Sequence, residues 1–252
     1  MLGLYNRNME RNILILVEYN GANFFGWQKQ KSKRTVQGVL EEKIALLTGE
    51  EVGIEGSGRT DKGVHALGQV ATFSTHSPIP LQNFKVALNK LLPQDVVVKK
   101  VGLAPIDFHP RFSAKRKTYV YVVDTRKTRR AIDYDRVTYY PYKINFERMQ
   151  SAGNIFIGRH NFKAFCASNA TVKTYEREIF DLKIRKSASR ILFEITGDGF
   201  LYNMVRIIVG TLLQIDKIGE ENINMALKTG DRSLVGKTMP PNGLYLKKVE
   251  YV

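Results

Sequence analysis

Short strand patterns and short helix patterns alternate along this chain, and their order is the feature that most limits its fold. Residues 12–19 alternate apolar side chains with a period of two, which predicts a buried strand. Thr35 is a typical N-cap for the helix pattern that follows, and Gly49 ends that pattern. The next predicted elements are a strand at 68–74, a helix at 81–92 and a strand at 96–101. The first half therefore predicts the order strand, helix, strand, helix, strand.

The second half contains more strand. Its predicted elements are a strand at 118–124, a helix at 145–152, a hairpin of strands at 178–185 and 191–196, a helix near 200–215, a helix near 223–228 and a strand at 243–251. The helix near 200–215 is mostly apolar, so its Arg206 needs a paired anion or a cleft to face. The best boundary lies near residues 105–110. We predict an α+β protein with two mixed halves, 1–105 and 106–252.

Composition excludes several classes of protein. A chain of 252 residues with 43% hydrophobic residues can bury a core in one or two domains. The longest apolar segment, 200–215, is interrupted by Asn203 and Arg206, which argues against a membrane span. Residues 1–11 lack the apolar core of a secretory signal, so we expect a cytoplasmic protein. One cysteine, Cys166, cannot form an internal disulfide, and the four histidines show no metal-ligand spacing.

The charge of the chain indicates a polyanionic partner. The sequence has 39 Lys and Arg against 24 Asp and Glu, a net charge of +15, and its pI is near 9.8. Such an excess favours nucleic acid, although lysines that only keep a surface soluble would give the same count. Basic groups at 115–117, 126–127 and 129–130 are interleaved with Tyr119 and Tyr121. This mixture suits phosphate contacts together with base stacking.

A loop rich in glycine and charge spans residues 56–66. Its glycines permit positive φ angles and close approach to a ligand, and its Asp61 stands between Arg59 and Lys62. Cations on both sides would keep a carboxylate fixed and ionised, as a nucleophile requires. The alternative is a surface hairpin built from ordinary turn residues. We interpret His65, at the end of the loop, as structural and not as a general base.

Two other enzyme classes fit the sequence poorly. Residues 53–60 have the spacing of a phosphate-binding loop, but Arg59 stands where that motif has lysine, and the pattern that follows predicts a strand instead of a helix. Hydrolysis by paired carboxylates needs a second acid near the first. Within six positions of Asp61 the sequence offers only Glu55, although a fold could bring another acid close.

Eight short motifs carry a specific resemblance to a known family. In order, they are Glu18–Gly21, Gly26–Gln30, Thr35–Gly38, Gly58–Ala66, Lys117–Tyr121, Gly158–Phe162, Phe200–Arg206 and Gly243–Leu246. Together they extend over nearly the whole chain. Their types and their order resemble those of the TruA family of tRNA pseudouridine synthases.

The resemblance implies a fold and an assembly. The family fold has two ferredoxin-like halves that form one extended mixed, mainly antiparallel sheet, with helices packed on one side and a central active-site cleft. Residues 1–105 would be the half that carries the nucleophile loop, and residues 106–252 the half that carries a base-stacking tyrosine and a pairing arginine. The family typically works as a homodimer in which one tRNA spans both subunits, without a membrane and without a nucleotide cofactor.

The resemblance also implies the chemistry. The expected reaction converts uridine to pseudouridine at tRNA positions 38, 39 and 40 without cofactor or metal, after the nucleotide is flipped out of its stack. Asp61 matches the family nucleophile, which attacks the base or the sugar. Arg59 matches an arginine that admits or holds the flipped nucleotide, Tyr119 the aromatic that packs on the base, Arg206 the arginine that pairs with the aspartate, and Leu244 a residue lining the pocket. The alternative is a non-catalytic RNA-binding protein on the same fold.

Overall fold

The computed structural model describes residues 9–167 and 172–251. Residues 1–8, which contribute to the expectation of no secretory signal, lie outside the described residues. The chain forms two compact units. The first contains the residues up to Ala114 together with those from Leu246 onward, and the second is Lys115–Tyr245. That 1–105 and 106–252 are separate domains stays a prediction.

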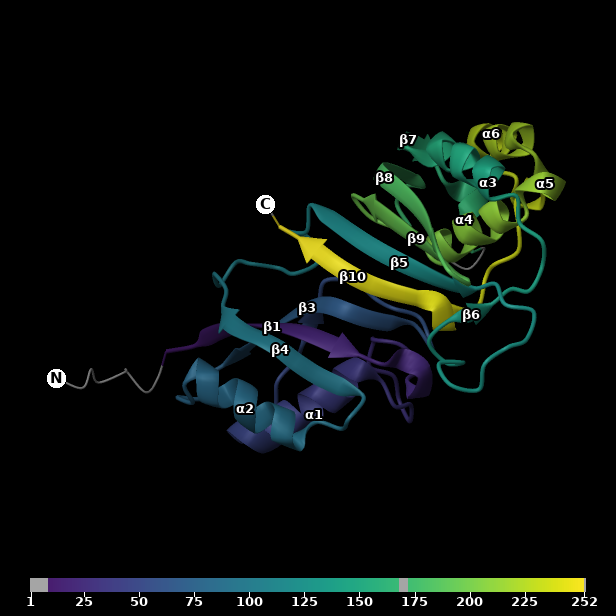
Figure 1. The fold of residues 1–252 in the computed structure, drawn as a ribbon. Coiled ribbons are helices and arrows are strands. Elements are labelled where there is room, and N and C mark those ends of the chain that lie inside the picture. The colour runs from purple at the N-terminus through teal and green to yellow at the C-terminus, as the bar shows by residue number, and fades with distance from the viewer. Residues whose placement is uncertain (1–8, 168–171, 252) are drawn as a thin grey trace. The chain divides into compact units, whose positions relative to one another are not determined.

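The first unit follows the order strand, helix, two strands, helix, strand. Its elements are β1 (Arg11–Tyr19), η1 (Gly21–Asn23), α1 (Val36–Thr48), β2 (Glu55–Gly56), β3 (His65–Thr75), α2 (Leu81–Leu91) and β4 (Val96–Leu103). β1 lies in the middle and pairs antiparallel with both β3 and β4, while β2 pairs antiparallel with β3. Both helices lie on one face of these strands (Figure 1). This βαββαβ order is that of a ferredoxin-like unit.

Period-two alternation explains the core of the first unit. Ile13, Ile15 and Val17 of β1 are fully buried because alternate side chains of a strand point to the same face. On α2, the buried ring of Phe84 packs 5.7 Å from that of Phe73 on β3, so the helix is fixed on the sheet by aromatic contact.

Both predicted ends of α1 are confirmed. The Thr35 hydroxyl accepts a hydrogen bond from the backbone N–H of Gly38, at 3.3 Å. At the other end, Gly49 adopts a left-handed conformation with φ of 74°, which glycine reaches without the steric penalty of a side chain. Turn chemistry visible in the sequence therefore sets the length of this helix.

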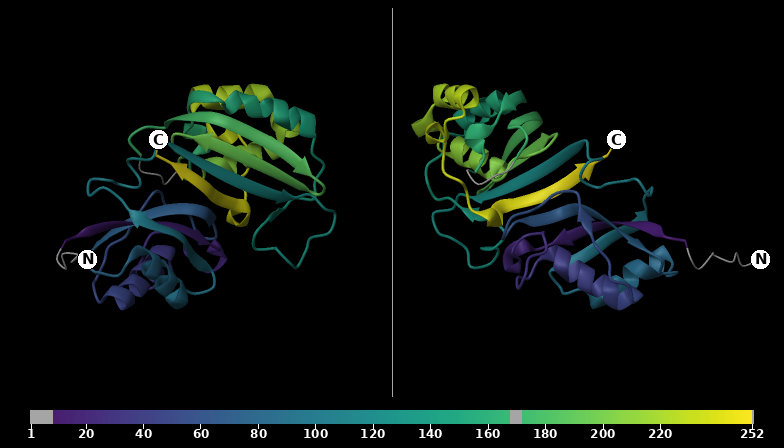
Figure 2. Two further views of the ribbon diagram at one scale, coloured as in Figure 1. Left: turned by 60° about the vertical axis from the view of Figure 1, so that its left-hand side comes forward. Right: turned by 180° about the vertical axis from the view of Figure 1, so that it is seen from behind.

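The second unit is also built from strands and helices, and it contains more strands. Its elements are β5 (Arg116–Asp124), β6 (Thr138–Tyr139), α3 (Phe146–Gly153), η2 (Asn154–Phe156), β7 (Gly158–Asn161), η3 (Lys163–Phe165), β8 (Glu176–Ser187), β9 (Arg190–Gly197), α4 (Met204–Leu213), α5 (Ile215–Ile218), α6 (Glu220–Thr229), η4 (Arg232–Leu234) and η5 (Pro241–Gly243). The strand order is β5-β9-β8-β7 with antiparallel pairing, and β6 runs parallel to β5. The views of Figure 2 show the helices of this unit gathered on one face of β5, β9 and β8.

The last strand returns the chain to the first unit. β10 (Leu244–Glu250) begins in the second unit, and from Leu246 onward it belongs to the first, where it lies beside β3. A Cβ on Gly68 of β3 would lie only 2.6 Å from the carbonyl oxygen of Lys247, so a glycine is required for this approach. After the strand, the Tyr251 hydroxyl donates to the carbonyl oxygen of Pro110 at 3.0 Å.

One predicted element starts later than expected. The pattern predicted a helix over 200–215, but α4 begins at Met204. Asn203 has a φ of 63°, in the left-handed region, and this interrupts the helical path before the first turn. Phe200 therefore lies in a loop before the helix, and its side chain is available to β5.

The predicted class of fold is confirmed. Both units are α+β, and their strands pair mainly antiparallel, while β5 and β6 pair in parallel. Among residues 9–167 and 172–251, none of the helices combines the length and the apolar character that a membrane span requires.

Candidate active site

The start of the loop that carries Asp61 is held by a buried glutamine of β3. The loop connects β2 to β3, and its first residue continues the ladder, since the Ser57 N–H donates to the carbonyl oxygen of Val70 at 2.8 Å. The Ser57 hydroxyl donates to the side-chain oxygen of Gln69, at 2.5 Å. The amide of that fully buried Gln69 donates to the carbonyl oxygen of Gly58, at 2.7 Å. The chain therefore leaves the sheet in a defined direction.

Thr60 fixes the middle of the loop. Its side chain is buried, and its hydroxyl lies 2.7 Å from the Tyr19 hydroxyl at the end of β1. Its carbonyl oxygen accepts a hydrogen bond from the Trp27 N–H at 3.0 Å. Gly26 allows this contact, because its φ is +85° and a Cβ there would lie 2.4 Å from the Thr60 oxygen. The residue before Asp61 is thus held by two other segments.

A tight turn holds the loop on the other side of Asp61. The Asp61 carbonyl oxygen accepts from the Val64 N–H at 3.1 Å, and the Gly63 N–H donates to the Phe24 carbonyl oxygen at 3.3 Å. Gly63 has a φ of 80°, a conformation that favours glycine. Asp61 itself is half-buried. The loop therefore presents a carboxylate on a backbone that is fixed on both sides.

His65 connects the start of β3 to a neighbouring turn. Its side chain is buried, and its Nδ1 accepts a hydrogen bond from the Gly21 N–H at 3.0 Å. This contact ties the start of β3 to the turn after β1.

The two cations that flank Asp61 both contact the segment before α1. The Arg59 Nε donates to the side-chain oxygen of Gln28 at 3.0 Å. The Lys62 ammonium lies 4.3 Å from the centre of the Phe25 ring, a cation–π contact. Each of these two cations therefore fixes the neighbouring segment against the loop. That they also hold the Asp61 carboxylate stays a prediction.

A small cavity opens beside Arg59. Its volume is about 180 Å³, and its lining includes Gln28, Gln37, Arg59 and Arg111. The lining also includes Glu55, so two guanidinium groups stand against one carboxylate, and the polar space has an excess of positive charge.

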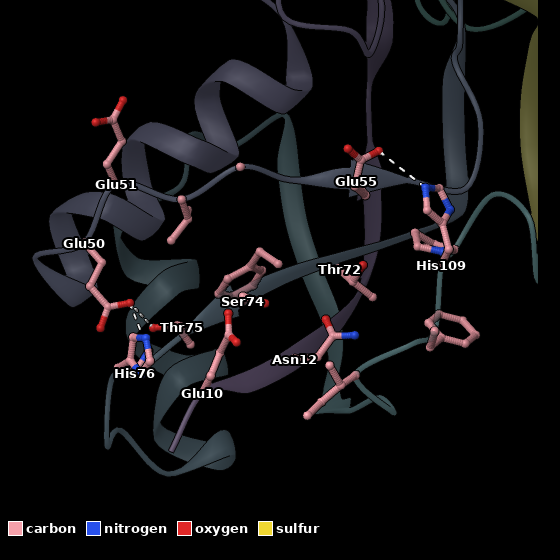
Figure 3. Close-up of a pocket in the computed structure, with 16 residues that line it drawn as sticks. Glu10, Asn12, Glu50, Glu51, Glu55, Thr72, Ser74, Thr75, His76 and His109 are labelled. Atoms are coloured by element: carbon pink, nitrogen blue, oxygen red, sulfur yellow. Dashed lines mark hydrogen bonds and ion pairs between the residues drawn. The ribbon is translucent and has the colours of Figure 1, made fainter. Parts of the chain in front are cut away.

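A second cavity of the first unit is larger and more acidic. It measures about 510 Å³ and is bordered by Glu10, Glu50, Glu51 and Glu55 (Figure 3). None of the predicted site residues lines it. Its acidic border is unfavourable for a phosphate backbone, so we place the RNA site elsewhere.

Tyr119 and Phe200 form an aromatic pair in the second unit. Tyr119 is a half-buried residue of β5, and its ring centre lies 5.1 Å from that of Phe200 with the planes at 80°. Phe200 reaches this place because α4 starts after it. This edge-to-face contact fixes the orientation of the Tyr119 ring against Phe200.

The structure places Arg206 in the first turns of α4. Its Nε donates to the Met239 carbonyl oxygen at 2.6 Å, and its Nη1 donates to the Asn203 side-chain oxygen at 2.5 Å. The side chain also lies near β5: burial raises the pKa of the Tyr121 hydroxyl, and the positive charge of Arg206 partly offsets that rise. The guanidinium is therefore oriented by two oxygens.

Leu244 is the first residue of β10 and is buried. The Tyr121 hydroxyl donates to the carbonyl oxygen of Pro240, four residues before Leu244, at 2.6 Å. This bond holds the segment that leads into β10 against β5.

The five predicted residues fall into two groups. Arg59 and Asp61 lie on one loop of the first unit, whereas Tyr119, Arg206 and Leu244 belong to the second. Sequence reasoning missed four supporting side chains, Gln28, Gln37, Arg111 and Phe200. For three of them the signal was present: Gln28, Gln37 and Phe200 lie inside the quoted motifs. Arg111 lies in none of these motifs and is recognised by its place in the cavity.

Comparison with known proteins identifies the chain. A family model described as tRNA pseudouridine synthase matches residues 15–113 and 152–252. Proteins named tRNA pseudouridine synthase A from Caldicellulosiruptor bescii and Acetivibrio thermocellus are each 46% identical over 96% of this chain and 100% of their own length. The protein of that name from Clostridium acetobutylicum is 42% identical over the same shares.

A distant likeness exists among solved structures. A chain of a Cbf5-Nop10-Gar1 complex is 12% identical with a TM-score of 0.40, over 96% of this chain and 59% of that one. This likeness is too weak to support an argument.

The similarity to relatives and to the family model defines an isomerase of the pseudouridine synthase class, which binds RNA and converts uridine to pseudouridine. Within that class, the chain belongs to the tRNA pseudouridine synthase family.

Proposed function

We propose that this enzyme modifies uridines at positions 38, 39 and 40 in the anticodon stem-loop of tRNA. The names of its relatives support tRNA as the substrate, and the eight motifs support the TruA type within the family. The net charge of +15 supports a long contact with a phosphate backbone.

The observation that carries the proposal is the fixed loop of Asp61. Thr60 on one side and the turn at Gly63 on the other hold the backbone, so the carboxylate needs little reorganisation to attack. Asp61 adds to the base or the sugar of the flipped uridine, and the bond from N1 to C1′ breaks. The uracil turns, C5 bonds to C1′, the C5 hydrogen leaves as a proton while N1 takes up a proton, and the carboxylate is released.

The other four residues receive roles around that step. Arg59 holds the flipped nucleotide, and Tyr119 packs on the uracil and replaces the stacking lost on flipping, worth about 1 to 3 kcal/mol. Arg206 pairs with Asp61 and keeps it ionised, and Leu244 lines the pocket.

We also propose a cytoplasmic homodimer that holds one tRNA across both subunits. The support is the family resemblance of the motifs. Sedimentation equilibrium of the purified protein tests the oligomeric state: twice the mass of the chain is expected, and a monomer at micromolar concentration would overturn this part.

A non-catalytic RNA-binding protein is the weaker candidate. Relatives named as synthases match over 96% of the chain, and they share the activity class and not only the fold.

Mapping the product tests the proposed positions. Unmodified tRNA transcripts with uridine at position 38, 39 or 40 alone are incubated with the enzyme, and pseudouridine is then located by sequencing after carbodiimide treatment. The expected product is pseudouridine at each of the three positions. Modification elsewhere, with none in the anticodon arm, would show that the proposed substrate positions are wrong.

A further inference from the structure

A continuous line of side-chain hydrogen bonds connects Arg59 to helix α1. Arg59 Nε donates to the Gln28 oxygen at 3.0 Å, and the Gln28 amide donates to the Gln37 oxygen at 2.8 Å. The Gln37 amide donates to the Glu41 carboxylate at 2.9 Å. The line thus runs from an exposed arginine of the Asp61 loop to a buried acid one turn into α1.

Backbone groups fix the direction of the Gln37 amide, and Gln37 in turn fixes that of Gln28. The Gln37 oxygen also accepts from the Lys29 N–H at 2.9 Å, and its amide also donates to the Ile54 carbonyl oxygen at 3.1 Å. An N–H can only donate and a carbonyl can only accept, so the Gln37 carboxamide has one orientation. Gln28 must then turn its amide toward Gln37 and its oxygen toward Arg59.

The buried end of the line is held by charge. Glu41 accepts from the Ile54 N–H at 3.2 Å, and its other oxygen lies 2.7 Å from the Lys29 ammonium. The hydrogen bond to Glu41 raises the pKa of Lys29, as an attractive pair requires. An ionised carboxylate only accepts, which sets the direction of the whole line.

This line orients the guanidinium. The Nε–H bond lies in the plane of the guanidinium, so this hydrogen bond restricts how the group can turn, and it uses one of its five N–H donors. Arg59 lines the small polar cavity together with Gln28 and Gln37, so the plane is set beside that space. Without the line, a long flexible side chain would have to be ordered during the reaction itself.

We propose that Gln28, Gln37 and Glu41 are positioning residues that hold the Arg59 guanidinium ready for the flipped nucleotide. The proposal rests on the role given to Arg59 under the proposed function. Gln37 and Glu41 act through Gln28, and Gln37 is the decisive member because its carboxamide joins the loop to the helix.

A double-mutant cycle tests the proposal. Gln37→Met, Arg59→Ala and the combined variant are compared with wild type by the single-turnover rate of pseudouridine formation and by the Kd for tRNA. Gln37→Met is expected to lower the rate about ten- to hundredfold and to change the Kd less than about twofold, because the phosphate contacts remain. In the Arg59→Ala background, Gln37→Met is expected to have no further effect on the rate.

Two further variants separate positioning from loss of structure. Gln28→Met, at a half-buried residue, is expected to give the same pattern with less loss of thermal stability. Thr75→Val removes a buried hydrogen bond to Glu50 elsewhere in the first unit and is expected to leave the rate unchanged.

The outcomes distinguish failure of the positioning inference from failure of the role proposed for Arg59. If Gln37→Met and Gln28→Met leave the single-turnover rate unchanged, the line of hydrogen bonds does not position Arg59. The same conclusion follows if they lower that rate equally with and without Arg59. If Arg59→Ala itself has no effect, the role of Arg59 in the proposed function is wrong, and the inference falls with it.

Discussion

At the residue scale, Gly26 and Thr60 set the position of Asp61. The Thr60 carbonyl oxygen lies where a side chain on Gly26 would have to go. Gly26→Ala is therefore expected to lower the stability by about 1 to 2 kcal/mol from its positive φ and to reduce turnover, because the loop must shift. Thermal unfolding and tRNA turnover measure the two effects.

Gly49→Ala is the matched control for this prediction. Gly49 has a similar φ of +74°, but nothing lies within 4 Å of its added Cβ. Gly49→Ala is expected to lower the stability by about 1 to 2 kcal/mol through its positive φ alone, less than Gly26→Ala, and to leave turnover unchanged. Equal turnover of the two variants would show that the approach to Thr60 does not matter for catalysis.

Tyr119 is expected to act through its ring. Tyr119→Phe keeps the ring and is expected to retain most of the activity, whereas Tyr119→Ala is expected to lower kcat/KM by about 5- to 150-fold, since stacking is worth about 1 to 3 kcal/mol. Tyr142→Ala, at an exposed tyrosine of the same unit, serves as the control. A strong loss in Tyr119→Phe would assign the role to the hydroxyl instead.

Single residues differ in how far the sequence predicts them. Asp61 and Arg59 are predicted because a glycine-rich loop and a known motif surround them. The link from Arg59 through Gln28 to Gln37 is invisible in the sequence, because its partners lie 31 and 9 positions apart and meet only through the fold.

At the element scale, capping residues and apolar patterns predict the helices and strands, and an unexpected backbone conformation shifts the end of one helix. α1 begins and ends where Thr35 and Gly49 predict. α4 begins four residues later than the predicted start at residue 200, because Asn203 takes a left-handed conformation that the apolar pattern does not reveal. That difference places Phe200 against Tyr119.

The end of β5 carries a charge pair with a defined pH dependence. The buried Asp124 carboxylate accepts hydrogen bonds from the Arg126 side chain, which lower the pKa of Asp124. A carboxyl with a lowered pKa in the folded state stabilises the fold above its unfolded pKa of about 3.9, and this stabilisation is lost as the pH falls through the folded pKa. The pair of Asp124 and Arg126 therefore stabilises the fold at neutral pH.

Asp124→Asn is expected to lower the thermal midpoint by about 2 to 4 °C at pH 7, for a loss of about 1 kcal/mol. The difference in thermal midpoint between Asp124→Asn and wild type should shrink as the pH falls below the pKa of Asp124 in the unfolded state. Asp181→Asn, which removes a more exposed pair with Lys183, is expected to show little change at either pH. A gap that stays constant with pH would contradict the charge account.

At the scale of the whole molecule, charge and connectivity matter most. The excess of 39 basic over 24 acidic residues predicted a nucleic-acid partner. The return of the chain from Leu246 onward to the first unit was not predicted, because a strand pattern does not state which partner it joins.

Binding of tRNA is expected to weaken steeply with salt. Raising the salt from about 50 to 200 mM should weaken the affinity more than tenfold, because counterions are released on binding, with a straight line of log K against log salt. Fluorescence anisotropy with labelled tRNA measures this. A flat line would mean that the positive charge does not contact the phosphates.

The central claim is that Asp61 is the nucleophile, and one measurement tests it most directly. Tritium release from tRNA labelled at uridine C5 is followed for wild type, Asp61→Ala and the control Asp107→Ala, an exposed aspartate of the same unit. Wild type and Asp107→Ala are expected to release tritium, and Asp61→Ala is expected to bind tRNA with wild-type affinity while releasing none above background. Release at the wild-type rate by Asp61→Ala would contradict the account.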